Sequence, residues 1–262
     1  MTRVIFVMLD GLRPDAITPE RTPHLTRAIA RGAHTLTARS VVPSITLPCH
    51  LSLMMSVPPA RHGILSNQYV PIARPVQGLF DLAHDAEKTC AMIYNWEELR
   101  DLSAPGALAY SHMIRASYDM DDGDDRIVAH AAPIVAAGVY DFTFIYLGTI
   151  DIAGHWHGWM SDGYLAQVQK IDALVGTLID AVTDDAVMIL QADHGGHDRF
   201  HGTEEPEDMT IPWIMLGAGV RAGHTIARDV NLLDTAPTIA HLLGLSAPRE
   251  WEGTPVVEAL IG

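Results

Sequence analysis

The sequence has few cysteines, fewer basic than acidic residues, and no hydrophobic run of membrane-spanning length. Its two cysteines, Cys49 and Cys90, cannot build a disulfide framework, so they do not require an oxidising compartment. Seventeen Lys and Arg against 32 Asp and Glu give a net charge of −15, which argues against a nucleic-acid-binding surface. The longest apolar stretch, 131–150, is interrupted by Asp141 and indicates a helix end followed by a strand.

Targeting and linker signals are also lacking. The chain enters the apolar run 4–9 directly after Met-Thr-Arg, and this run is too short for a signal-peptide core with its cleavage site. We therefore expect a cytoplasmic protein that does not associate with membranes. No repeat and no Pro-, Gly- or Ser-rich linker divides the 262 residues, so we expect a single domain over 1–262.

Short, continuous apolar runs alternate with helix-like stretches, as in a sheet covered on both faces. Together they predict an α/β fold, a three-layer sandwich around a central, mostly parallel sheet. Segment 95–125 is the least patterned and is interpreted as either an excursion or a lid. We expect strands at 4–9, 89–94, 142–147, 186–190 and 213–216, and helices at 23–31, 79–88, 126–137, 164–182 and 232–243.

Acidic residues and histidines follow three of the expected strands. Asp10 ends the first strand, Asp151 and His155 follow the strand at 142–147, and Asp193 and His194 follow the strand at 186–190, with His201 close behind. Ligands bind beyond the carboxyl ends of parallel strands, so these side chains should gather at one sheet edge. Carboxylate oxygens and imidazole nitrogens suit zinc, and six candidates are enough for two ions with three protein ligands each.

Thr46 is the candidate nucleophile. Pro48 suits the first turn of a helix that runs to Met55, and Thr46 falls at or next to its N-cap. A hydroxyl at this place faces the positive end of the helix dipole, which favours an alkoxide and an incoming phosphate. The alternative is that Thr46 serves only as an N-cap.

Seven segments of the chain together resemble the alkaline phosphatase superfamily, and most closely its type I phosphodiesterase/nucleotide pyrophosphatase branch. They occur in the family's order and span nearly the whole chain. The segments are LDGLRPD (9–15), PSITLPCH (43–50), HGILSN (62–67), DIAGH (151–155), DHG (193–195), HG (201–202) and LDTAPTIA (233–240).

The resemblance implies an alkaline-phosphatase-like fold and a site with two divalent ions, zinc before manganese or iron. One ion would bind Asp151, His155 and His201. The other would bind Asp10, Asp193, His194 and the Thr46 oxygen. Asn67 matches the family's asparagine that donates to a phosphate oxygen. Tyr146 falls where nucleotide-cleaving members stack an aromatic ring on the base, with a buried strand tyrosine as the alternative; Leu47 and His157 are further candidates for substrate contact.

Three departures from the family pattern concern the substrate. Leu47 replaces the usual aromatic residue after the nucleophile, Cys49 replaces an asparagine, and only six residues separate His194 from His201 where the branch has a long insertion. The resemblance implies hydrolysis of phosphodiester or pyrophosphate bonds in a small-molecule phosphate ester, through a zinc-activated Thr46 and a phosphothreonine intermediate. Alternatives are a phosphomonoesterase or a phosphonate- or sulfate-ester hydrolase on the same scaffold and, more remotely, a non-catalytic metal-binding interaction domain.

Two further features have ordinary interpretations. The acidic run 119–125 lacks the ligand spacing of a calcium loop and is expected to be a solvated loop and helix start. His197 lies between ligand candidates and either supports a ligand or has no part in the site.

Overall fold

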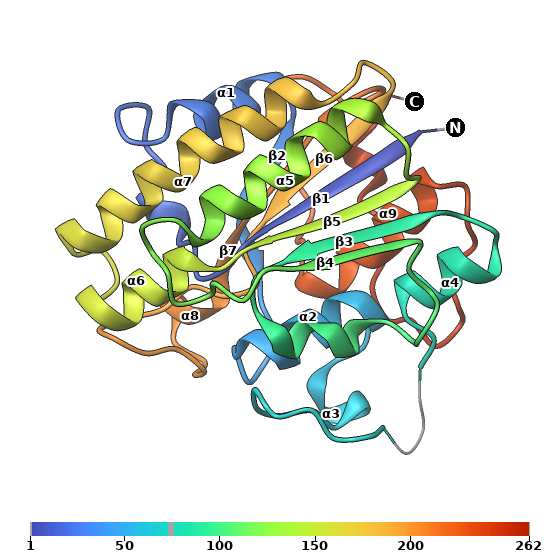
Figure 1. Ribbon diagram of the computed structural model, residues 1–262, viewed down its shortest axis with the longest axis horizontal. Helices are drawn as coiled ribbons and strands as arrows, with labels where there is room; N and C mark the ends of the chain where they lie inside the picture. The colour runs from blue at the N-terminus through green and yellow to red at the C-terminus, as the bar shows by residue number, and fades with distance from the viewer. Residues whose placement is uncertain (1, 73–75, 262) are drawn as a thin grey trace.

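The computed structural model describes residues 2–72 and 76–261, and the strands in this part of the chain form one eight-stranded sheet (Figure 1). The strand order across the sheet is β4-β3-β5-β1-β6-β7-β2-β8. The strands are β1 Arg3–Leu9, β2 Ala33–Arg39, β3 Cys90–Tyr94, β4 Tyr110–Met113, β5 Phe142–Leu147, β6 Ala186–Gln191, β7 Thr210–Gly217 and β8 His224–Thr225.

The middle of the sheet is parallel. β1 lies between β5 and β6, with Val4 opposite both Phe142 and Val187, and β3 continues the parallel order beyond β5. β7 is antiparallel to both of its neighbours, β6 and β2. All residues of β5 and β6 are buried, because helices cover both faces of these strands. The predicted α/β fold with a mostly parallel sheet is confirmed.

Helices form a layer on each face (Figure 1). On one face α7 contacts α1, α5 and α6, and on the other α2 contacts α4 and α9. The first layer comprises α1 Pro23–Arg31, α5 Gly123–Ala137, α6 Thr149–His157 and α7 Asp162–Ala181. The second comprises α2 Thr46–Met55, α3 Pro59–His62, α4 Leu79–Asp85 and α9 Thr235–Leu242; α8 Pro206–Met209 precedes β7, and short 3-10 turns lie at 14–16, 97–102, 232–234 and 257–259. The five helices and five strands expected from the sequence are all present, with boundaries shifted by a few residues. β2, β4 and β8 add to the expected strands.

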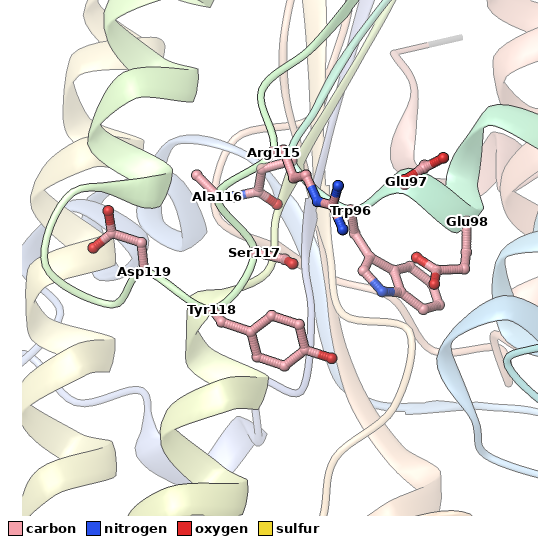
Figure 2. Close-up of a pocket in the computed structure, with 9 residues that line it drawn as sticks. Trp96, Glu97, Glu98, Arg115, Ala116, Ser117, Tyr118 and Asp119 are labelled. Atoms are coloured by element: carbon pink, nitrogen blue, oxygen red, sulfur yellow. The ribbon is translucent and has the colours of Figure 1, made fainter.

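Segment 95–125 is partly regular. Its 3-10 turn Glu97–Leu102 is followed by β4, which pairs in parallel with β3 and forms one edge of the sheet. The residues after β3 and after β4 face each other across a cavity of about 640 Å³ (Figure 2). Segment 95–125 therefore extends the sheet and builds two walls of a cavity at its carboxyl edge.

None of the helices in the described ranges is both long enough and apolar enough to span a membrane.

Candidate active site

The three aspartates expected at strand ends lie on neighbouring strands. Asp10 directly follows β1, Asp193 follows β6 after Ala192, and Asp151 lies in the first turn of α6, which begins just beyond β5. Because β5, β1 and β6 are adjacent, their carboxyl ends bring the three carboxylates to one edge of the sheet. All three side chains are buried.

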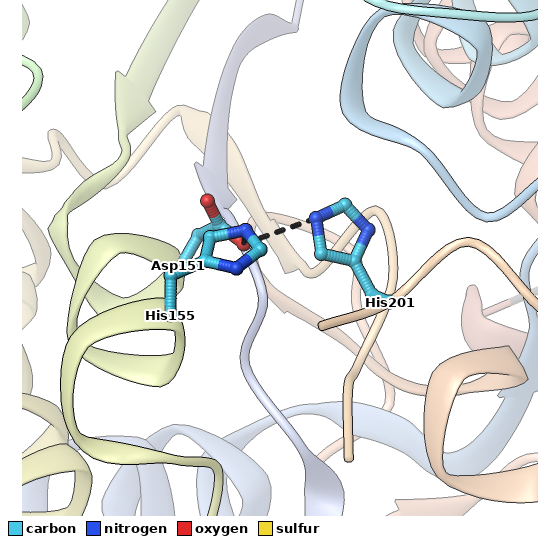
Figure 3. A group of neighbouring side chains, drawn as sticks. All are labelled: Asp151, His155 and His201. Atoms are coloured by element: carbon cyan, nitrogen blue, oxygen red, sulfur yellow. Dashed lines mark ion pairs between the residues drawn. The ribbon is translucent and has the colours of Figure 1, made fainter. Parts of the chain in front are cut away.

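The first metal-ligand cluster joins α6 to the loop after β6. Asp151 Oδ1 lies 3.5 Å from the Nε2 atoms of both His155 and His201. Figure 3 shows Asp151 and His155 projecting from one helix toward His201 on the opposite segment. Asp151 and His155 are four residues apart, so they lie on the same face of α6.

The second cluster surrounds His194. Its Nε2 lies 3.3 Å from Asp10 Oδ1 and 3.4 Å from Asp193 Oδ2. Ligand atoms of Asp10, Asp151 and His194 also lie within 4.8 Å of one another, so Asp151 adjoins both clusters. The rings of His194 and His201 stack with centroids 3.7 Å apart. The six residues of the two proposed ligand sets therefore form one continuous group.

Backbone carbonyls orient the three histidines. Nδ1 lies 2.8 Å from the Arg199 oxygen in His155, 2.8 Å from the Gly195 oxygen in His194, and 2.7 Å from the Ser44 oxygen in His201. A carbonyl oxygen only accepts hydrogen bonds, so Nδ1 carries a proton in each ring, and the neutral ring then has its lone pair on Nε2. Three lone pairs are thus directed into the site, the usual arrangement of metal-binding histidines.

The carboxylates lack hydrogen-bond donors where the site is most buried. Asp10 Oδ1, Asp151 Oδ1 and Asp193 Oδ2 are buried without a hydrogen-bond partner in the described part of the chain. Burial, followed by repulsion from Asp193 and Asp151, raises the pKa of Asp10 well above its usual value, and burial raises the pKa of Asp151. Burial and the neighbouring His194 lower the pKa of His201 to about 2, so its ring stays neutral. Unpaired oxygens beside free imidazole nitrogens fit divalent cations, which would satisfy both.

Thr46 lies in this group. It is the first residue of α2, and Ile45, not Thr46, occupies the N-cap position of this helix. Instead, Thr46 Oγ1 lies 3.2 Å from His194 Nε2. With the neutral His194 ring, whose Nδ1 donates to the Gly195 oxygen, the hydroxyl donates to this nitrogen. The alternative of Thr46 as a plain N-cap is therefore wrong, and its oxygen is directed at the second cluster.

Asn67 reaches the same helix start. Its Oδ1 accepts the Leu47 amide N–H at 2.9 Å, and the residue is exposed. This bond occupies the Leu47 N–H, which therefore cannot serve a phosphate oxygen unless Asn67 releases it. The Leu47 side chain is fully buried in the core and does not face a substrate. The expectation of substrate contact through Leu47 is corrected accordingly.

Tyr146 is also buried, being 4% exposed, so its ring has no open face for a substrate base. Its hydroxyl donates to Asp10 Oδ2, opposite the oxygen that faces the cluster. The ring lies over Gly148, where an added Cβ would be 2.7 Å from a ring carbon, so glycine is needed there. Of the two interpretations of Tyr146, the structure supports the buried strand tyrosine. The stacking role is corrected.

His157 and His197 differ in their surroundings. His157 is exposed at the end of α6, with its ring against Gly163 at the start of α7. His197 Nδ1 lies 2.7 Å from Asp208 Oδ1, and Asp208 Oδ2 accepts from both the N–H and the hydroxyl of Thr203. His197 thus helps to hold the short loop that carries His201.

Asp124 is a supporting residue that the sequence pattern does not reveal. The acidic run around it is expected to be solvated, yet Asp124 is 1% exposed and its carboxylate accepts four hydrogen bonds. The donors are Asn95 Nδ2 at 2.7 Å, the N–H groups of Gly148 and Thr149 at 3.1 and 2.9 Å, and the Thr149 hydroxyl. Asp124 therefore holds the start of α6, the helix that carries Asp151 and His155. The only sequence signal is its place beside the expected helix start, where acidic residues are favoured anyway.

Family models match both halves of the chain. Residues 4–96 match "Type I phosphodiesterase / nucleotide pyrophosphatase", and residues 111–247, more than half of the chain, match "Metalloenzyme superfamily". The chain belongs to the metalloenzyme superfamily, which includes the alkaline phosphatases.

Individual relatives are distant. A phosphopentomutase from Agathobacter rectalis is 27% identical over 122 residues, which cover 46% of this chain and 31% of the relative. The chain thus matches about a third of the length of such curated relatives. Among solved structures, murine ectonucleotide pyrophosphatase/phosphodiesterase 5, in an inactive form with AMP, has a TM-score of 0.83 at 16% identity and 100% coverage of each chain. A phosphonate monoester hydrolase from Silicibacter pomeroyi has a TM-score of 0.76 at 15% identity, covering 99% of this chain and 76% of its own. These likenesses confirm the alkaline-phosphatase-like fold.

Proposed function

We propose that the protein is a metal-dependent hydrolase of phosphodiester or pyrophosphate bonds in small-molecule esters, with Thr46 as its nucleophile. The position of Thr46 carries the proposal: the residue is 4% exposed at the start of α2, and its hydroxyl oxygen lies 3.2 Å from a histidine of the ligand group. A cytoplasmic location, a single domain over 1–262 and the absence of a nucleic-acid surface belong to the same proposal.

Two divalent ions, zinc before manganese or iron, complete the proposed site. Asp151, His155 and His201 would hold one ion, and Asp10, Asp193 and His194, together with the Thr46 oxygen, would hold the other. The mixture of carboxylate oxygen and neutral imidazole nitrogen is the donor set on which the preference for zinc rests. When bound, such ions supply positive charge that favours the Thr46 alkoxide and withdraws charge from phosphoryl oxygens.

The chain's own residues then account for two displacements at phosphorus. Thr46 Oγ1 loses its proton and forms a bond to phosphorus as the bond from phosphorus to the leaving oxygen breaks. The leaving group takes up a proton and departs as an alcohol from a diester, or as a phosphate from a pyrophosphate. Asn67 stands at the start of α2, where its amide can donate to a phosphoryl oxygen. Water then attacks the phosphothreonine, which restores the Thr46 hydroxyl and releases the phosphate product. Two in-line displacements give net retention at phosphorus.

A phosphomonoesterase or a phosphonate- or sulfate-ester hydrolase is the second candidate. Two observations favour keeping it: the likeness in fold to a phosphonate monoester hydrolase and the short segment between His194 and His201. Cys49 offers no support for a cysteine-derived sulfatase nucleophile, because it is fully buried within α2. A non-catalytic metal-binding domain remains as the remote alternative.

A substrate panel separates these candidates. Hydrolysis of p-nitrophenyl phosphate, bis-p-nitrophenyl phosphate, a nucleotide p-nitrophenyl ester and p-nitrophenyl sulfate is compared with metal-loaded protein. We expect the diesters to have the highest kcat/KM; dominance of the monoester or the sulfate would favour the second candidate. Thr46→Ala should keep its metals yet lower kcat about a thousandfold, which corresponds to about 4 kcal/mol of barrier. Thr46→Ser should retain part of the activity. Inversion with a chiral phosphorothioate diester would show that water attacks directly and that Thr46 is only a ligand.

A further inference from the structure

The cavity lined by residues of segment 95–125 lies at the same sheet edge as the metal-ligand group. The residues that form its walls come after β3 and after β4 in the chain. β3 is the neighbour of β5 in the sheet, and the chain passes from β5 into α6. Asn95 lines the cavity and donates to Asp124, and Asp124 in turn holds the first residues of α6. The cavity is therefore joined to the helix of Asp151 by a chain of buried hydrogen bonds.

Two aromatic side chains and one arginine distinguish this cavity. Figure 2 shows Arg115 and Tyr118 on the segment after β4, facing Trp96 and Glu98 on the segment after β3. Tyr118 is 72% exposed, which is unusual for a large aromatic side chain. An indole and a phenol on opposite walls can hold the flat or apolar part of a small molecule between them.

Arg115 has no hydrogen bond and no ion pair within residues 2–72 and 76–261. This is notable in a chain with almost twice as many acidic as basic residues. The nearby acids are largely engaged: Glu97 pairs with Arg100 at 2.5 Å, and Asp119 accepts two backbone N–H groups of its own turn. Glu98 is the one acid of the cavity for which no such partner is described. The guanidinium is thus free to bind an anion in its forked, two-donor geometry.

We propose that this cavity binds the part of the substrate remote from the reacting phosphorus, and that Arg115 selects esters with a second anionic group there. The second group is a carboxylate or a phosphate, and Trp96 and Tyr118 hold the portion that links it to the ester. A strongly acidic protein repels a multiply charged anion, so a local cation is needed to accept such a group. This inference rests on the proposed function, because it places the ester phosphorus at Thr46.

The test uses 4-nitrophenyl aryl phosphodiesters whose second aryl group bears carboxylate, phosphonate, neutral carboxamide or trimethylammonium at its para position. Wild type should prefer the carboxylate or phosphonate over the carboxamide by about tenfold to a hundredfold in kcat/KM, the size of a charge-assisted hydrogen bond. The better of these two anions identifies the natural group. Arg115→Met should reduce the preference to about one, and Arg115→Lys should keep part of it.

Two variants serve as controls. Arg31→Met removes another exposed cation, which lies beside residues 182–184, before β6 and at the opposite edge of the sheet. This variant should leave the preference unchanged. Glu98→Gln tests whether the cavity binds a cationic group instead. If the trimethylammonium ester is the best substrate of the wild type and loses this advantage in Glu98→Gln, the cavity selects cations and the proposal is wrong. An anion preference that survives in Arg115→Met would overturn it as well.

Binding without turnover separates this inference from the proposed function. Calorimetric affinities are measured for 4-carboxybenzylphosphonate and 4-carbamoylbenzylphosphonate, which contain no bond for the enzyme to hydrolyse. If neither diesters nor monoesters are hydrolysed but the carboxylate compound still binds more tightly in an Arg115-dependent way, the cavity is an anion site and the proposed reaction is wrong. If diesters are hydrolysed and Arg115 affects neither rate nor affinity, the reaction stands and the cavity assignment fails.

Discussion

Replacing Asp124 by alanine should destabilise both the fold and the metal site, because one buried carboxylate holds the start of α6. The substitution removes four hydrogen bonds and leaves the N–H groups of Gly148 and Thr149 without an acceptor. A buried donor without a partner costs about 1–3 kcal/mol. Water entering from the cavity beside Asn95 recovers part of this, so we expect a total loss of about 3–5 kcal/mol.

Urea unfolding followed by circular dichroism measures the loss of stability. With a slope of about 3 kcal/mol per molar urea, the midpoint should fall by about 1 M or more. The first turn of α6 also positions Asp151, so divalent-metal affinity, measured by competition with a chromophoric chelator, should fall about 10- to 100-fold. Asp124→Asn keeps one acceptor oxygen and should give an intermediate loss.

Asp125→Ala is the matched control. The neighbouring carboxylate is partly exposed and pairs with Lys170 at 2.7 Å, so its removal should cost less than about 1 kcal/mol and leave metal affinity unchanged. If Asp124→Ala is no less stable than Asp125→Ala, the role assigned to the buried hydrogen bonds is wrong. If stability falls but metal affinity does not, the link from Asp124 to the ligand set is wrong.

Three other predictions concern the metals, Tyr146 and pH. Chelation should abolish hydrolysis and lower the midpoint of unfolding. Ions that bind only the folded state stabilise it by about 2.7 kcal/mol each when their free concentration is a hundred times their Kd. Unchanged activity in metal-free protein would contradict the metal hypothesis. Tyr146→Phe removes the hydroxyl that donates to Asp10 and should weaken metal binding about tenfold, whereas an unchanged affinity would show that Asp10 needs no such partner. Burial lowers the pKa of His62 to about 4 from its ordinary 6.5, so the unfolded chain takes up a proton that the folded chain refuses. The free energy of unfolding should therefore fall by up to about 3 kcal/mol as pH decreases from about 6.5 to 4, and a His62→Gln variant with the same pH dependence would refute this assignment.

The sequence alone determined the order of the main elements and the edge of the sheet at which the chemistry gathers. Continuous apolar runs identify buried strands, and the carboxyl ends of parallel strands share one edge. Residues directly after those runs, such as Asp10, Asp151 and Asp193, can therefore be grouped by their positions along the chain. Thr46 can be identified as the candidate nucleophile because it lies next to the helix start that Pro48 indicates, which is again a local sequence signal.

The tertiary structure decided what depends on contacts between distant segments. Whether Tyr146 stacks on a substrate or donates to Asp10 depends on the packing of two neighbouring strands, and no local pattern distinguishes the two. Asp124 looks like any acid at a helix start, and only the approach of α6 and Asn95 buries it. The cavity likewise combines residues after β3 with residues after β4, about 20 positions apart, because β4 pairs with β3 in parallel. Local sequence specifies backbone preference and burial, but which polar groups meet is set by the register and packing of the whole sheet.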